Sequence, residues 1–175
     1  MFLFLAPRFP IWNQILLMLD IVIADTSCLI LFHKIGELDI LRKVYDSVTT
    51  TPEVAQEFQE ILPDWILIEN VKDKKYQEFL ETQIDWGEAS AIALAKEKEF
   101  ALLLLDDLKA RKLATKLNLK VTGTLGVIHK AKQIGILDKV KPLIEKLQAT
   151  NFRISENIIE ELLRKNNEFN PHNPL

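Results

Sequence analysis

Residues 21–27 read Ile-Val-Ile-Ala-Asp-Thr-Ser, a short apolar run that stops at a carboxylate. Four consecutive apolar residues are typical of a strand that is buried on both faces. An aspartate inside such a strand would be costly to bury, so we expect Asp25 to lie at its end. Thr26 and Ser27 can cap a following helix, because their hydroxyl oxygens accept backbone N–H groups. The stretch therefore predicts a strand, an acid and a helix, in that order.

The rest of the chain repeats this order and predicts the fold class. A second apolar run, residues 100–105, also stops at acids, Asp106 and Asp107. Strand patterns that alternate with helical patterns favour an α/β fold, a three-layer α/β/α sandwich with a mainly parallel sheet. The predicted strands lie at residues 21–24, 47–50, 65–69, 100–105 and 119–121. The predicted helices lie at residues 28–34, 37–45, 52–61, 73–81, 88–97, 108–117, 125–133, 137–147 and 156–165.

We expect a single domain over residues 20–165, since single domains usually hold about 100–200 residues. Residues 1–19 are predicted to be an N-terminal extension, for which Met18 offers an alternative start. Their longest uncharged piece, residues 9–19, is shorter than the roughly 20 residues that a membrane span requires. Residues 166–175 are predicted to be a flexible tail. The expected protein is cytoplasmic, with no membrane segment.

The composition excludes several classes of site. A single cysteine, Cys28, rules out an internal disulfide framework and a four-cysteine metal site. We expect it to be a small buried packing residue. The three histidines, His33, His129 and His172, fall in predicted helices and in the tail, which gives little support to a Ser/His/Asp hydrolase. The chain also has no glycine-rich phosphate loop of the Walker type, which disfavours an NTPase.

Charge is unevenly distributed, although the net charge is only −3. Residues 46–99 hold thirteen acidic residues and five lysines, whereas residues 108–147 hold ten Lys or Arg and two acidic residues. A basic stripe can follow a phosphate backbone, and it can equally be a set of solvated helix faces. The candidate phosphate contacts follow the second acidic strand end, at Lys109, Arg111, Lys112 and Lys116.

Several acids are predicted to meet at one edge of the sheet. The carboxyl ends of parallel strands share an edge, which brings Asp25 and Asp106 together. The start of an alanine-rich helix adds Glu88, and the helix after Pro52 adds Glu57 or Glu53. Clustered carboxylates repel one another and favour a cation. Oxygen ligands without His or Cys indicate Mg²⁺ or Mn²⁺, which can activate water against a phosphodiester.

Five short motifs follow one another along the chain. They are residues 23–27 (Ile-Ala-Asp-Thr-Ser), 52–58 (Pro-Glu-Val-Ala-Gln-Glu-Phe), 87–95 (Gly-Glu-Ala-Ser-Ala-Ile-Ala-Leu-Ala), 103–107 (Leu-Leu-Leu-Asp-Asp) with Ala110-Arg111, and 123–126 (Gly-Thr-Leu-Gly). No single motif is specific, but their order and spacing together are. On these motifs, residues 20–165 resemble a PIN (PilT N-terminal) domain, in particular the short prokaryotic proteins related to the toxins of VapBC-type toxin–antitoxin pairs.

The resemblance implies a flat parallel sheet flanked by helices and Mg²⁺- or Mn²⁺-dependent cleavage of single-stranded RNA. It also implies a small antitoxin protein as partner and a homodimer. The four acids of the family match Asp25, Glu57, Glu88 and Asp106, with Glu53 as the alternative for the second. Many members have Asp where this chain has Glu88, so the longer side chain must reach the site differently.

Other residues near these acids resemble supporting positions of the family. Asp107 is either a further metal ligand or a helix cap. Thr26 and Ser27, and more weakly Thr124, resemble hydroxyl residues that steady a metal-bound water or a phosphate. Two other functions stay open. One is a non-catalytic interaction module with the same fold, and the other is a metal-dependent phosphohydrolase of another α/β family. A receiver domain is disfavoured, because its acid pair follows the first strand.

Overall fold

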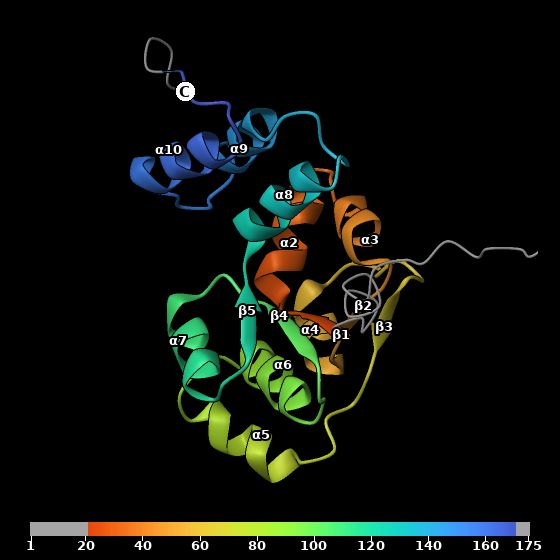
Figure 1. Ribbon diagram of the computed structural model, residues 1–175. Coiled ribbons are helices and arrows are strands. Elements are labelled where there is room, and N and C mark those ends of the chain that lie inside the picture. Colours follow the sequence, from red (N-terminus) through yellow and green to blue (C-terminus); the bar gives the residue numbers. More distant parts are fainter. Residues whose placement is uncertain (1–20, 171–175) are drawn as a thin grey trace, which may run out of the picture.

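The computed structural model describes residues 21–170, so the predicted N-terminal extension and the last residues of the predicted tail lie outside it. Its centre is a five-stranded sheet with the order β3-β2-β1-β4-β5, in which every neighbouring pair is parallel (Figure 1). The strands are β1 (Ile21–Ala24), β2 (Val48–Thr50), β3 (Ile66–Ile68), β4 (Ala101–Leu104) and β5 (Lys120–Thr122). The predicted parallel sheet is confirmed.

The stretch quoted first forms the middle strand, β1. Val22, Ile23 and Ala24 are buried, and β1 pairs with both β2 and β4. Ala24 lies opposite Leu104 in the register, and the backbone N–H of Asp25 donates to the carbonyl of Leu104 over 3.1 Å. This register brings the acidic ends of β1 and β4 side by side.

Helices cover both faces of the sheet, which confirms the three-layer sandwich (Figure 1). One buried cluster joins the sheet to α2 (Thr26–Lys34), α3 (Asp39–Tyr45), α4 (Pro52–Phe58), α8 (Thr124–Gln133), α9 (Lys141–Gln148) and α10 (Glu156–Lys165). The other joins it to α5 (Lys74–Glu81), α6 (Trp86–Lys96) and α7 (Leu108–Lys116). The alanines of α6 are almost all fully buried, as its small residues allow close packing against the sheet.

Two helices near the acids differ in their bounds from the prediction. Helix α4 ends at Phe58 and not at residue 61, because Gln59 takes a left-handed conformation with φ 62° and closes the helix. Helix α6 begins at Trp86, two residues before the predicted start, since Asp85 takes the extended conformation of an N-cap. Trp86 and Gly87 therefore belong to the first turn of α6 and not to a preceding loop.

Residues 166–170, predicted to belong to a flexible tail, make contacts with the rest of the fold. Asn166 is buried, and its amide donates to the carbonyl of Leu162 over 2.7 Å. The carboxylate of Glu168 accepts the backbone N–H groups of Val140 and Lys141 at the start of α9, at 2.8 to 3.0 Å. Helix α9 has no side-chain cap of its own, so this acid supplies the missing acceptor.

Candidate active site

A pocket of about 520 Å³ opens at the carboxyl end of β1, between α2, α4 and the start of α6. Strand ends and helix starts of a parallel sheet meet at such an edge, where ligands commonly bind. None of the described residues that line the pocket is Lys, Arg or His. Those residues are Asp25, Thr26, Ser27, Ile30, Glu57, Asp85, Trp86 and Glu88.

Asp25 lies at the floor of this edge with 1% of its surface exposed. One carboxylate oxygen accepts the backbone N–H of Cys28 over 2.9 Å, and the other accepts the Ser27 hydroxyl over 2.6 Å. The N-cap of α2 is thus Asp25 itself, and the expectation that Thr26 or Ser27 caps this helix is wrong. The acid can take this place because β1 ends one residue before it.

Helix α4 presents Glu57 to the pocket through its last turn. The Thr26 hydroxyl donates to one Glu57 oxygen over 2.5 Å, and the Gly87 N–H donates to the other over 3.2 Å. A Cβ atom at Gly87 would collide with the Glu57 carboxylate and would lie 2.8 Å from Thr26 Oγ1. Glycine at this position therefore allows α6 to approach α4 closely enough for the contact.

Glu53, the alternative second acid, faces away from the pocket. Its Oε1 accepts Lys74 Nζ over 2.8 Å and Gln77 Nε2 over 3.0 Å, both from α5. Burial alone would raise the pKa of Glu53, but the hydrogen bonds from Lys74 and Gln77 outweigh it and lower the pKa overall. The geometry thus favours Glu57 over Glu53 as the acid of the site.

Asp106 follows β4 by two residues and lies beside Asp25 without lining the pocket itself. It accepts the Thr124 backbone N–H over 2.9 Å and the Thr124 hydroxyl over 2.6 Å. The buried Cys28 thiol lies 3.1 Å from Asp106 and 3.2 Å from the Thr124 hydroxyl. Cys28 packs in the core as expected, and its sulfur also contacts Asp106, an acid after β4, which no sequence pattern predicted.

Asp107 caps α7, since its Oδ1 accepts the N–H groups of Lys109 and Ala110 at 2.7 and 2.8 Å. Of the two alternatives for Asp107, a helix cap or a metal ligand, the structure therefore contains the helix cap. Asp107 also borders a second hollow of about 290 Å³, which shares Asp85 and Glu88 with the first. Asp85 borders both hollows and is not among the predicted site residues, although its place before Gly87 and Glu88 was an available signal.

The carboxylates influence one another's ionisation. Burial raises the pKa of Asp25 to about 7, with Asp106 and Glu88 adding repulsion and the bonds from Ser27 and Cys28 opposing it. Burial likewise raises the pKa of Glu88 to about 7, with repulsion from Asp107, Asp85 and Glu57. A cation between these groups would relieve the repulsion.

The donor set fits a hard divalent ion. All candidate ligands are carboxylate or hydroxyl oxygens, which Mg²⁺ and Mn²⁺ prefer. In residues 21–170 no three His, Cys, Asp or Glu side chains lie close enough to hold one ion together. Mg²⁺ usually keeps several waters and binds through one or two carboxylates, so the site fits an ion that the remaining acids contact through water.

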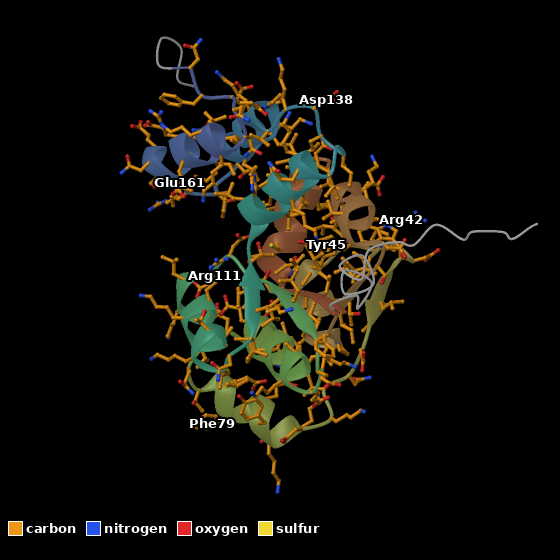
Figure 2. All side chains as sticks on the ribbon, viewed as in Figure 1. Arg42, Tyr45, Phe79, Arg111, Asp138 and Glu161 are labelled. Atoms are coloured by element: carbon orange, nitrogen blue, oxygen red, sulfur yellow. The ribbon has the colours of Figure 1, made fainter. Side chains whose placement is uncertain are left out.

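The predicted phosphate contacts lie on α7. Lys109, Lys112 and Lys116 are exposed. Arg111, which Figure 2 labels, is half-buried. The Arg111 guanidinium donates to the carbonyl of Leu105 over 2.8 Å. A Cβ atom at Gly123 would lie 2.6 Å from Asp106 Oδ1 and 2.8 Å from Arg111 Nη1, so this cation and this acid border the same point.

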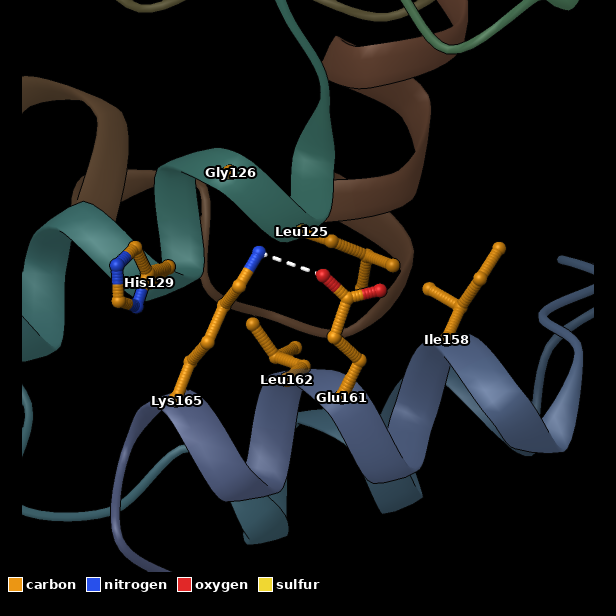
Figure 3. Close-up of a pocket in the computed structure, with 7 residues that line it drawn as sticks. All are labelled: Leu125, Gly126, His129, Ile158, Glu161, Leu162 and Lys165. Carbon is orange, nitrogen blue, oxygen red and sulfur yellow. Dashed lines mark ion pairs between the residues drawn. The ribbon is translucent and has the colours of Figure 1, made fainter.

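A separate groove of about 200 Å³ lies between α8 and α10 (Figure 3). Apolar side chains form much of its wall, and on α10 an ion pair of 2.7 Å joins Lys165 to Glu161, one turn apart. None of the predicted acids lines it. The lining residues are Leu125, Gly126, His129, Ile158, Glu161, Leu162 and Lys165.

Comparisons with known proteins agree with the architecture. A family model described as a PIN domain matches residues 21–168, nearly the whole of the described chain. Searches of curated proteins and of solved structures found no match. Within residues 21–170, no helix has the length and apolar character that crossing a membrane requires.

Proposed function

The chain belongs to the PIN domain family, whose fold is of the nuclease type, and we propose that it is a metal-dependent endoribonuclease that cleaves single-stranded RNA. The observation that carries this proposal is the meeting of Asp25, Glu57 and Glu88 at one pocket, with Asp106 beside them. These acids come from four separate segments of the chain, and none of the described residues that line the pocket is Lys, Arg or His.

We propose Mg²⁺ or Mn²⁺ as the cofactor, with Asp25 and Glu88 as its main holders. When bound, such an ion supplies positive charge to a phosphodiester and makes a water molecule acidic enough to attack it. Glu57 and Asp106 would orient waters of that ion. Thr26 and Ser27, whose hydroxyls donate to Glu57 and Asp25, keep those carboxylates in place.

The basic side chains of α7 would guide the phosphate backbone toward the acids. Arg111 is the best placed, because it lies next to Asp106. Thr124 holds Asp106 from the other side, through its hydroxyl and its N–H. The family resemblance supports four further proposals. The substrate is single-stranded RNA, a small antitoxin protein is the inhibitor, the protein forms a homodimer, and it is located in the cytoplasm.

Cleavage of a labelled single-stranded RNA tests the proposal. The purified protein is expected to cleave with Mg²⁺ or Mn²⁺ and to stop when EDTA is added. Asp25→Asn should reduce cleavage by at least about 100-fold, since loss of one preorganised charged group commonly has this effect. Asp39→Asn, an exposed acid at the start of α3, is the matched control and should cleave as the wild type does. Equal cleavage by the two variants would reject the proposal.

One observation favours the alternative of a non-catalytic interaction module: within the described residues no three acids form a closed metal cage. A titration with Mn²⁺ separates the two functions. A nuclease should bind Mn²⁺ in the wild type and lose that binding in Asp25→Asn. A module without activity should show no Mn²⁺ binding that depends on Asp25.

A further inference from the structure

Among the described residues that line the pocket of Asp25, Glu57 and Glu88, Trp86 is the one large aromatic side chain. It is the first residue of α6, and 39% of its surface is exposed, whereas the following residues of the helix are mostly buried. Ile30 of α2, half-buried, lines the same pocket. The hollow that holds Asp25, Glu57 and Glu88 thus also has an apolar part, which the acids do not explain.

The backbone beside Trp86 is held in place. Its neighbour Gly87 donates its N–H to Glu57 over 3.2 Å and leaves no room for a Cβ atom against that carboxylate. The carbonyl of Asp85 accepts the N–H of Ala89 over 2.8 Å, which closes the first turn of α6. The indole therefore projects from a fixed point two residues from Glu88, and little ordering is needed before a flat ligand contacts it.

We propose that Trp86 stacks on an unpaired RNA base next to the phosphodiester that the acids engage. The inference rests on the ribonuclease function proposed above and adds what recognises the substrate. The carboxylates offer a base no flat surface, whereas an exposed indole attracts any base through its π-face, whatever the sequence. In a duplex both faces of a base are covered by its neighbours, so this contact selects single strands.

Steady-state cleavage of a short single-stranded RNA by Trp86→Leu and Trp86→Phe tests the proposal. Leucine keeps an apolar side chain without a ring, and we expect it to lower kcat/KM about tenfold, mainly through KM, because stacking of one base has roughly that effect. Phenylalanine keeps a ring and should remain within about threefold of the wild type. Trp65→Phe, outside the pocket, is the control and should change nothing.

Substrates that lack one base, placed in turn along the RNA, identify the partner of Trp86. At one position the missing base should lower kcat/KM of the wild type about tenfold and leave Trp86→Leu unaffected. The salt dependence should be the same in both proteins, because stacking involves no ion release. A role of Trp86 in folding alone would instead lower cleavage of every substrate by the same factor.

The outcomes separate this inference from the proposed function. If Trp86→Leu cleaves the intact RNA like the wild type, or if the missing base affects both proteins equally, stacking is excluded and the ribonuclease function stands. If Trp86→Leu does not fold, intact and abasic RNAs are compared with the wild type and Trp86→Phe alone. Stacking is then excluded if removal of a base lowers kcat/KM at none of the positions. If the wild type cleaves no RNA with either ion, both proposals fall.

Discussion

Helix α4 leads into two acidic regions that differ sharply. At its first turn, Glu53 packs against α5 and accepts hydrogen bonds from Lys74 and Gln77. At its last turn, Glu57 faces a pocket that it shares with Asp25 and Glu88. None of the described residues that line this pocket is Lys, Arg or His. In the first region the protein supplies the positive charge, and in the second it does not.

The difference between the two regions shows how to separate structural from functional acids. The pKa of Glu53 is lowered, because the hydrogen bonds from Lys74 and Gln77 outweigh its burial. The pKa values of Asp25 and Glu88 are raised to about 7 by burial and by neighbouring acids. Groups held at a raised pKa in a pocket are candidates for function, since folding alone would favour a partner.

The largest expected effect comes from removing an acid of the pocket, Glu57. Glu57→Gln removes one charge from the acid set while keeping a side chain that can still bind Thr26 and Gly87. We expect cleavage of single-stranded RNA to fall by about 100-fold or more, with a free energy of unfolding close to that of the wild type. Single-turnover cleavage and urea denaturation check the two parts. A Glu57→Gln protein with wild-type cleavage would show that Glu57 belongs with the structural acids.

The second expected effect is a loss of stability with rising pH, which the raised pKa values in the pocket produce. Between about pH 4 and pH 7 the folded protein holds protons on Asp25 and Glu88 that the unfolded chain has lost. Their stabilising contribution is therefore complete below about pH 4 and is lost as the pH rises to about 7. We expect the free energy of unfolding of the metal-free protein to fall by several kcal/mol across this window, because one pKa unit corresponds to about 1.4 kcal/mol.

Thermal or urea unfolding in EDTA measures this loss, and saturating Mn²⁺ should restore stability above pH 7, because the ion binds ionised carboxylates. Asp25→Asn should flatten the profile. An EDTA profile that is identical in the wild type and Asp25→Asn would contradict the repulsion on which the site depends.

The third expected effect breaks the other side of the comparison. Glu53→Gln removes the charge that Lys74 and Gln77 bind, and we expect the free energy of unfolding to fall by about 1–2 kcal/mol near pH 7. Because the pKa of Glu53 is lowered, its contribution is present above the carboxylate's usual range and is lost as the pH falls below it. The specific cleavage rate of the folded fraction should stay unchanged. A large loss of cleavage in a fully folded Glu53→Gln protein would place Glu53 in the site.

The smallest expected effect concerns the surfaces around the two regions. Lys112→Ala on α7 should lower kcat/KM for RNA about twofold to threefold and reduce its salt slope by roughly 0.7, as for one lost phosphate contact on a single strand. Lys75→Ala on α5, next to Lys74 in the sequence, is the matched control, since Lys75 is also exposed. Equal salt slopes for the two variants would remove the phosphate role of α7.

Much of the fold could be predicted because the signals are local. The apolar runs before Asp25 and Asp106 predict buried strands, and parallel strands bring their ends to one edge. Helix bounds were less predictable. The left-handed Gln59 carries no strong sequence signal, and Asp85, although a preferred N-cap residue type, precedes Trp86 and Gly87, which are weak helix formers. The cap of α9 by Glu168 could not be foreseen, because it joins residues 27 and 28 positions apart.

The sequence by itself determined that Asp25 and Asp106 stand at the ends of buried strands and that Glu88 opens a small-residue helix. Only the tertiary structure paired Glu53 with α5, turned Glu57 toward the pocket, made Asp107 the cap of α7 and set Trp86 on the pocket wall. The physical reason is that the position of a residue in a helix sets the face on which its side chain lies. The group that this side chain contacts belongs to another element, which only the tertiary structure brings there. Lys74, 21 residues away along the chain, is what makes Glu53 a structural acid and leaves Glu57 for the site.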